Sequence, residues 1–367
     1  MGDEVLGSGA QLAPVVDDVS IWLIPGRTKD PAPALQQAVD AERLGFRRAF
    51  VSERFDLKEA GALLGGVLAR TSRLEAGTGI AAAGARSPLM AAAMAATLHA
   101  AYGHRFIFGL GRSSGPYLAG QGIREMGLRG FEDYFDLLRR LFRGEEVTYQ
   151  GPAGNYQGMR TVDPCPGKPP ELWATSMGGP KATKLAARIA DGLILPGFLT
   201  SEAVARAAEM VRAERERHDL DPKAFRILYY MITANDLDEE YTRAIAHARL
   251  VTYVVGMPAF AQAYITNNGW DATQMRRLLD DQRFQSMGRP TADQTYHRSD
   301  LIEVSKRVPE EWVHDTCAIG SLSHCLDKIR EYRNAGADEI GFYGSTPAEN
   351  ARLIDGWRGS IDRGPSG

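Results

Sequence analysis

Short apolar runs alternate along this chain with longer segments that have the periodicity or the composition of helices. The runs predict strands at residues 19–24, 47–52, 74–80, 105–110, 171–175, 192–195, 225–233 and 338–343. The intervening segments predict helices at residues 30–44, 57–71, 88–102, 131–143, 180–189, 201–218 and 321–335, and a last helix from about residue 347. Gly45, Gly103 and Gly336 follow three of these helices, as expected of residues that end them.

The order of these elements predicts an α/β fold. Strands that alternate with helices at this spacing form a parallel sheet, because each helix carries the chain back to the start of the next strand. Eight such units predict a closed (β/α)8 TIM barrel. An open, doubly wound sheet is the alternative that the same pattern allows.

Two segments interrupt the alternation. Residues 145–163 read as a β-hairpin around a Gly-Pro-Ala-Gly-Asn turn, and a mostly helical stretch runs from about Leu237 to Thr316. We expect a single barrel domain over residues 19–360, preceded by an N-terminal extension at 1–18. Its insertions lie at 145–163 and 256–316, the second of them a helical insertion before the last strand.

Composition excludes several classes of function. The net charge is −3, with 43 basic and 46 acidic side chains interspersed, which argues against nucleic acid as a partner. The three cysteines lie far apart and the seven histidines are scattered, so neither a disulfide framework nor a metal site is expected. The chain has no signal-peptide pattern and no apolar run of the ~20 residues that cross a membrane. These features predict a cytoplasmic protein that acts on a small molecule.

Ligands of α/β barrels bind at the carboxyl ends of the strands. The strand at 105–110 is followed by Arg112 and Ser113, which places a cation where an anion would bind. The next strand is followed by Ser176, Met177, Gly178 and Gly179, a backbone that a ligand can approach closely, and then by a proline that suits the first turn of a helix. Two anion-suited loops at neighbouring strand ends predict a phosphate site. The alternative is a tight glycine turn and an arginine paired with a surface carboxylate.

Two further strand ends carry candidate residues. Glu53 and Arg54 follow the second strand, and they are either a ligand contact with a proton donor or an ion pair that ties two loops together. Thr78 and Gly79 end the third strand, where the glycine indicates a bulge or unusual backbone geometry. No P-loop, HExxH or CxxC pattern is present, so the sequence offers no nucleotide loop or zinc motif.

An ordered series of short motifs resembles the bacterial luciferase-like superfamily, a set of flavin- or deazaflavin-dependent oxidoreductases built on (β/α)8 barrels. The motifs are Leu44-Gly45-Phe46 with Phe50-Val51-Ser52-Glu53, Gly77-Thr78-Gly79-Ile80 before Ser87-Pro88, His104-Arg105-Phe106 with Phe108-Gly109-Leu110-Gly111, Leu185-Ala186-Ala187 with Ala190-Asp191-Gly192, and Ile319-Gly320-Ser321 with Ala335-Gly336-Ala337-Asp338. They span residues 19–344 in the family's order.

The resemblance implies roles for the same strand ends. The cofactor ring would pack against Thr78 and Gly79, where relatives often carry a non-proline cis peptide, and Arg112 would bind the cofactor phosphate beside the loop at 176–179. The family's F420-dependent sugar-phosphate dehydrogenases carry a catalytic histidine where this chain has Arg54, and a catalytic acid near Ser114. These departures predict that this chain is not that dehydrogenase.

The resemblance leads to one preferred function and two alternatives. The preferred one is hydride transfer between coenzyme F420 and a small organic substrate under the 256–316 insertion, with Glu53 or Tyr117 assisting proton transfer. The first alternative is an FMN-dependent monooxygenase that uses reduced flavin and O₂. The second is a barrel that binds a cofactor without turnover. Relatives are commonly dimers, so a homodimer is expected.

Overall fold

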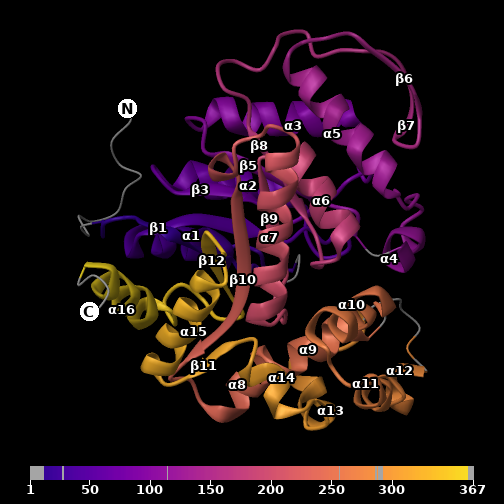
Figure 1. The fold of residues 1–367 in the computed structure, drawn as a ribbon. Coiled ribbons are helices and arrows are strands. Elements are labelled where there is room, and N and C mark those ends of the chain that lie inside the picture. The colour runs from indigo at the N-terminus through magenta and orange to yellow at the C-terminus, as the bar shows by residue number, and fades with distance from the viewer. Residues whose placement is uncertain are drawn as a thin grey trace.

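Eight parallel strands close into a barrel in the computed structural model, which describes residues 12–26, 29–113, 115–255, 257–285, 287 and 292–362 (Figure 1). In order around the barrel they are β1 (Val16–Trp22), β2 (Phe46–Val51), β3 (Glu75–Thr78), β5 (Phe106–Gly111), β8 (Glu171–Thr175), β9 (Gly192–Leu195), β10 (Arg226–Asn235) and β12 (Glu339–Tyr343). β12 pairs with β1 and β10 pairs with β9, so the ring closes. The predicted (β/α)8 barrel is confirmed, and the open-sheet alternative is wrong.

Helices surround the barrel, and all except α4 (Gly115–Gly120), which was not predicted, lie close to the predicted boundaries. They are α1 (Pro33–Leu44), α2 (Ala60–Arg70), α3 (Pro88–Ala101), α4 (Gly115–Gly120), α5 (Leu128–Phe142), α6 (Pro180–Ile189), α7 (Ser201–Arg217), α15 (Leu322–Asn334) and α16 (Ala351–Asp362). Side-chain caps fix several starts: the hydroxyls of Ser87, Thr200 and Ser321 each accept a hydrogen bond from a backbone N–H in the first turn. Gly45 ends α1 in a left-handed conformation, at φ 85°.

The third strand differs from the prediction. Residues 74–80 were expected as one strand, but β3 ends at Thr78, the Gly79–Ile80 peptide is cis, and the chain resumes pairing with β5 as the two-residue strand β4 (Ala81–Ala82). The neighbouring strand approaches so closely that a Cβ on Gly109 would overlap the carbonyl oxygen of Thr78. The glycines in this pair of strands are therefore required by packing.

Both interruptions of the alternation have the expected secondary structure. The hairpin consists of the antiparallel strands β6 (Val147–Gly151) and β7 (Gly154–Met159), at the edge of the molecule beside α5 in Figure 1. After β10 come α8 (Glu239–Ile245), α9 (His247–Val254), α10 (Pro258–Asn268), α11 (Ala272–Leu279), α12 (Gln282–Gln285), η2 (Ala292–Gln294), η3 (Arg298–Leu301), α13 (Ile302–Ser305) and α14 (Glu310–His314). We refer to residues 239–314 as the helical insertion. A short strand that the pattern did not predict, β11 (Ala318–Gly320), then pairs with the end of β10.

The interior of the barrel has an apolar layer and an ionic layer. Large side chains fill the middle: Trp22, Phe50, Ile107, Trp173, Ile194 and Leu228. Towards the amino ends of the strands, the buried carboxylate of Glu339 accepts hydrogen bonds from Ser20, Arg48 and Arg226. The polar residues plug the amino end of the barrel, so a ligand has access only to the carboxyl end.

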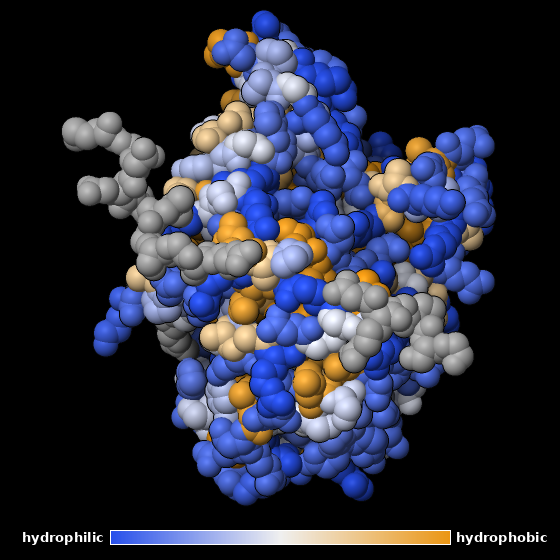
Figure 2. All heavy atoms as spheres, turned by 90° about the vertical axis from the view of Figure 1, so that its left-hand side faces the viewer, coloured by the Kyte–Doolittle hydropathy of each residue, from blue (hydrophilic) through white to orange (hydrophobic). Residues whose placement is uncertain are grey.

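The outer surface is mainly hydrophilic. The face in Figure 2 is dominated by hydrophilic side chains, with hydrophobic positions gathered near its centre. Exposed large hydrophobic side chains come from separate elements, for example Met90 on α3 and Val162 after the hairpin. Within the described ranges, no single helix is long and apolar enough to cross a membrane, although the bent helix pair 239–254 and 259–268 reaches that length and composition.

Candidate functional site

A cavity of about 850 Å³ lies at the carboxyl ends of the barrel strands, and we call it the mouth cavity. Side chains and backbone from seven barrel strands or the turns after them line it: Ser52 to Arg54 after β2, Gly79 and Ile80 after β3, Arg112 and Ser113 at the end of β5, Thr175 to Met177 at β8, Pro196 after β9, Tyr230 of β10, and Tyr343 at the end of β12. The cavity brings together Glu53, Tyr117, Gly79, Arg112, Ser113, Ser176, Met177 and Gly179 of the predicted site.

Trp22 supports the cavity from below. Its ring is buried, stacks on Phe50 at 4.7 Å between centroids, and lies 5.0 Å from the ring of Tyr230. The indole N–H donates to the carbonyl oxygen of Gly79 at 2.9 Å, and the hydroxyl of Ser52 donates to the same oxygen at 2.8 Å. A Cβ on Gly79 would lie 2.5 Å from the Trp22 ring, so only glycine fits at this position. The backbone at Gly79 is thus held rigidly at the cavity floor.

Thr78 lies beside this floor but does not line the cavity. Its side chain is fully buried and its hydroxyl donates to the carbonyl oxygen of Gly109 at 2.6 Å. The contact ties β3 to β5. Thr78 therefore contributes to the site by fixing the position of Gly79, and its own side chain is not available to a ligand.

Arg112 is one of the cations that line the mouth cavity without an ion-pair partner among the described residues. Its guanidinium is partly buried, and within the described residues it forms no ion pair and no side-chain hydrogen bond. Ser113 follows in a left-handed backbone conformation, at φ 61°, and its side chain is exposed. An arginine held at a cavity wall without a carboxylate partner is available to bind an anion.

The loop after β8 places a helix amino end beside Arg112. Gly179 is the N-cap of α6, no side chain caps this helix, and Pro180, Lys181 and Ala182 of its first turn line the cavity. The uncapped backbone N–H groups and the helix dipole favour an anion at this position. Ser176 is less available, because its hydroxyl is bonded to Thr183 at 2.8 Å and accepts from the Gly178 N–H.

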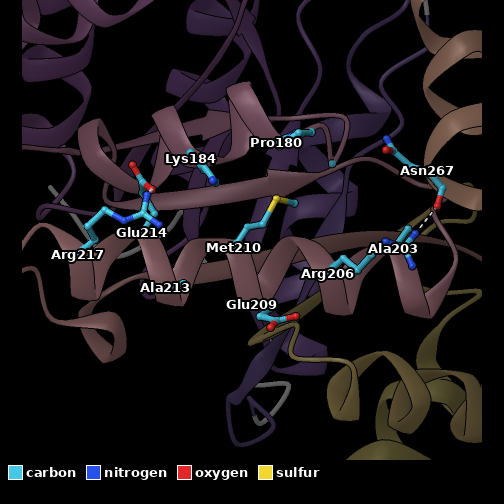
Figure 3. A pocket seen from close by; sticks show the side chains of 11 residues that line it. Pro180, Lys184, Ala203, Arg206, Glu209, Met210, Ala213, Glu214, Arg217 and Asn267 are labelled. Atoms are coloured by element: carbon cyan, nitrogen blue, oxygen red, sulfur yellow. Dashed lines mark hydrogen bonds and ion pairs between the residues drawn. The ribbon is translucent and has the colours of Figure 1, made fainter.

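Gly178 faces the other side of this loop. It lines a second hollow of about 500 Å³ between α6 and α7, outside the barrel mouth (Figure 3). Lys184 and Met210 face each other across this outer hollow, and Arg206 donates to the carbonyl oxygen of Asn267. The structure therefore separates Gly178 from the other predicted residues of the loop, although its positive φ of 84° shapes the turn that carries them.

Glu53 is held in an ion pair. Both oxygens of its buried carboxylate accept hydrogen bonds from Arg86, at 2.9 and 2.5 Å, and Arg86 also contacts Glu59. The bidentate pair joins the loop after β2 to the loop before α3. This geometry favours the second interpretation of the Glu53 position, an ion pair that ties two loops together, because Arg86 occupies both carboxylate oxygens.

Glu53→Gln provides a test of that interpretation. If the carboxylate is structural, the variant should lose about 1–3 kcal/mol of stability, because the Arg86 guanidinium loses its charged partner in a largely buried place. The pH profile of turnover should stay unchanged. A displaced or missing limb in the pH profile, with normal stability, would instead assign the proton transfer to Glu53. Chemical denaturation and steady-state kinetics measure the two quantities.

Tyr117 is buried on α4 with its hydroxyl engaged on both sides. The hydroxyl accepts from the Phe55 N–H at 3.0 Å and donates to Asp56 at 3.0 Å, and the guanidinium of Arg54 lies 4.8 Å from the ring centroid. Burial is the main cause of the raised pKa of Tyr117. The phenol therefore stays protonated at neutral pH and is connected to solvent-facing Asp56 by one hydrogen bond.

The helical insertion supplies a wall of the cavity, and the sequence did not predict which of its residues line it. Arg249, Thr252 and Tyr253 of α9 line it, as do Met257, Ala259 and Phe260 at α10 and Asp293 of η2. Asp293 forms an ion pair with Arg54, which links the insertion to the loop after β2. Tyr343 could have been found in the sequence, since it ends the last predicted strand. Arg249 could not, because α9 is buried on most sides and its apolar pattern does not reveal which face meets the cavity.

The mouth cavity is rich in positive charge. The described residues that line it include five basic side chains, Arg54, Lys58, Arg112, Lys181 and Arg249, and two acidic ones, Glu53 and Asp293. Both acids are already paired with arginines. No group of three or more histidine, cysteine, aspartate or glutamate side chains in the described ranges is arranged to hold a metal ion. A cavity of this charge suits an anionic ligand.

Comparison with known sequences identifies the family of this chain. The sequence matches the luciferase-like monooxygenase family over residues 16–339. The chain belongs to this family. It is therefore an enzyme with a luciferase-like barrel, and the motifs at Gly77–Ile80 and Phe108–Gly111 lie in the matched region. The resemblance to the luciferase-like superfamily that the sequence motifs indicated is confirmed.

Individual relatives of this luciferase-like enzyme include an F420-dependent dehydrogenase and a ketoreductase. The F420-dependent glucose-6-phosphate dehydrogenase of Nakamurella multipartita is 31% identical over 277 residues, which cover 68% of this chain and 76% of the relative. The phthiodiolone/phenolphthiodiolone dimycocerosates ketoreductase of Mycobacterium tuberculosis is 25% identical over 313 residues, or 81% of this chain and 76% of the relative.

Solved structures share the fold of this luciferase-like enzyme. The coenzyme F420 dependent tetrahydromethanopterin reductase of Methanopyrus kandleri superposes with a TM-score of 0.74 at 19% identity, covering 94% of this chain and 98% of that one. The oxygenating constituent of 3,6-diketocamphane monooxygenase from Pseudomonas putida, solved with FMN, gives a TM-score of 0.60 at 16% identity, covering 93% and 97%. At these identities the likeness shows the barrel fold, which reductases and monooxygenases share.

Proposed function

We propose that this enzyme transfers a hydride between coenzyme F420 and a small organic substrate in the mouth cavity. The observation that carries the proposal is the pairing of Arg112 with the uncapped amino end of α6 at neighbouring strand ends, beside the rigid backbone at Gly79. An F420-dependent relative at 31% identity supports the choice of the deazaflavin. The position of Arg54 in place of the relatives' histidine, expected from the resemblance, supports a substrate other than a sugar phosphate.

The residues present fit a phosphorylated tricyclic cofactor. Arg112, Ser113 and the first turn of α6 would hold the phosphate, because they offer a free guanidinium and uncapped N–H groups in one corner. The ring would lie over Gly79 and Ile80, which line the cavity where Trp22 supports the backbone from below. When bound, the deazaflavin supplies the hydride acceptor or donor of the reaction.

The side chains of the protein would bind and orient the substrate and exclude water from the site. Tyr253, Met257 and Phe260 of the helical insertion form an apolar cover over the mouth cavity, which favours hydride transfer by keeping solvent out. Tyr117, whose hydroxyl donates to Asp56, is the protonated side chain that we propose for assisting proton transfer. Ser114, the other position named by the resemblance, lies outside the described residues.

An FMN-dependent monooxygenase is the second candidate. The same phosphate corner suits FMN, and a solved structure of the same fold contains FMN. Titrating the protein separately with F420 and with FMN distinguishes the two candidate functions. We expect F420 to bind with quenching of its fluorescence and FMN to bind at least tenfold more weakly. Tight FMN binding with no binding of F420 would overturn the proposal in favour of the monooxygenase.

Arg112→Ala should weaken F420 binding by about 1.5–3 kcal/mol, which is about 10- to 150-fold, because a charged hydrogen bond to the phosphate is lost. Fluorescence titration of the purified variant measures the change. Arg129→Ala is the matched control, since Arg129 is exposed on α5 and pairs only with Glu132 and Asp133 among the described residues. Equal affinities for the two variants would remove Arg112 from the cofactor site.

A further inference from the structure

The mouth cavity has a second basic end, on the side opposite Arg112. In the closed ring, β12 lies four strands away from β5, so Tyr343 at the end of β12 lies across the mouth from Arg112 at the end of β5. Tyr343, Arg249 and Lys58 all line this side. If the cofactor phosphate binds at Arg112, this second set of cations is left for another group.

Arg249 is built into this end of the cavity. Only 7% of the residue is exposed, and its guanidinium carbon lies 4.1 Å from the centroid of the Tyr343 ring. Its Nε donates to the carbonyl oxygen of Ile245 at 3.1 Å. Within the part of the chain that the structure describes, no carboxylate forms an ion pair with it. A buried guanidinium without a counter-ion is costly unless an anion joins it.

Two more cations lie near this end of the cavity: Lys58 lines it and is close to Tyr343, and Arg298 is close to Arg249 but does not line the cavity. Arg298 begins η3, which packs against α9, and the charge of Arg249 is the main cause of the lowered pKa of Arg298. Lys58 follows the turn after β2, and burial is the main cause of its lowered pKa. Neither forms an ion pair with a described carboxylate, and one terminal nitrogen of Arg298 is buried without a hydrogen-bond partner.

The phenol of Tyr343 completes the cluster. Burial alone would raise its pKa, but the charges of Arg249, Arg298 and Lys58 outweigh burial and lower the pKa from the usual 10.0. A phenol of lowered pKa is a stronger hydrogen-bond donor. The arginine side of the cavity thus has unneutralised cations and a polarised hydroxyl, which is the donor set of an oxyanion site.

We propose that Arg249, Lys58 and Tyr343 form a substrate subsite that binds an oxyanion group, a carboxylate or a phosphate, and that the nearby charge of Arg298 strengthens it. This inference rests on the proposed function, because it takes the Arg112 end as the cofactor end. It makes the substrate an organic anion whose charged group is held near β12, while its reacting carbon points towards Gly79 and the cofactor ring.

The test uses the Arg112→Ala variant without cofactor and inorganic phosphate as the probe, followed by ³¹P nuclear magnetic resonance or calorimetry. In this variant the proposed cofactor-phosphate site at Arg112 is weakened. The phosphate binding that remains therefore measures the proposed subsite near the end of β12. Adding Arg249→Met should weaken that binding at least tenfold, and adding Arg249→Lys should weaken it less. The control adds Arg243→Met instead, since Arg243 lies in the same insertion but is paired with Glu310. Thermal melting of each variant verifies that it is folded.

The outcomes separate this inference from the proposed function. Equal phosphate binding with Arg249→Met and with Arg243→Met would overturn the subsite, whatever the cofactor proves to be. Unchanged F420 affinity in Arg112→Ala would contradict the cofactor end and leave the phosphate result standing. Acetate in place of phosphate then distinguishes the two sources of the oxyanion: stronger competition by acetate indicates a carboxylate substrate, and stronger binding of phosphate indicates a phosphorylated one.

Discussion

Replacing Glu339 with glutamine should destabilise the folded protein by about 3–5 kcal/mol, the cost of breaking a buried ion pair by removing one partner. The Glu339 side chain is fully buried at the amino end of the barrel, where it accepts from Ser20, Arg48 and Arg226. A neutral amide leaves the charge of Arg226 without its buried partner and Arg48 with Glu75 alone. Urea denaturation followed by circular dichroism measures the loss.

The control for this prediction is an exposed ion pair. Glu303→Gln removes a carboxylate 2.7 Å from Lys306, but both side chains are more than half exposed. Because solvent screens such pairs, we expect a change of at most ~1 kcal/mol. If Glu339→Gln were as mild as Glu303→Gln, the ionic layer would not contribute to holding the strands of the barrel together.

Trp22→Ala should cost about 3–5 kcal/mol of stability, as other large-to-small changes of a buried tryptophan do. The ring is 1% exposed, stacks on Phe50, and donates to the Gly79 carbonyl. The substitution leaves a void under Gly79, and the floor of the mouth cavity loses its support. F420 affinity should therefore fall in the same variant. Denaturation and fluorescence titration give the two values.

Trp22→Phe separates packing from hydrogen bonding at this position. The phenyl ring keeps most of the contact with Phe50 but loses the N–H donor to Gly79, so we expect a smaller loss, about 1–2 kcal/mol. The Gly79 oxygen still accepts from Ser52, which limits the penalty. Wild-type stability of Trp22→Ala would contradict the assignment of this ring to the barrel core.

The apolar runs predicted the barrel because its strands are buried on both faces. Strands of this kind, such as Phe106–Gly111, need continuous apolar residues, and that signal is local and strong. β1 starts three residues earlier than predicted, at Val16, because Asp17 and Asp18 interrupt the apolar run there. β11 has three residues, too few for a pattern to predict.

The structure brings predicted residues together where chain order fixes their position. Arg112 and the loop at 176–179 follow strands that are neighbours around the barrel, so their meeting followed from the fold class alone. The pairing of Glu53 with Arg86, 33 residues away, depends on how two loops pack and has no pattern in the sequence. The dimeric state and the cytoplasmic location stay predictions.

The sequence by itself determined the family, the number and order of the barrel strands, and the basic corner at Arg112, because each depends on residues close together in the chain. Only the tertiary structure decided that Gly178 faces the outer hollow and that Arg249 stacks on Tyr343 at one side of the mouth cavity. Both depend on the rotation and packing of helices that are buried on several sides. There the hydrophobic pattern identifies a helix but does not determine which of its faces meets the ligand.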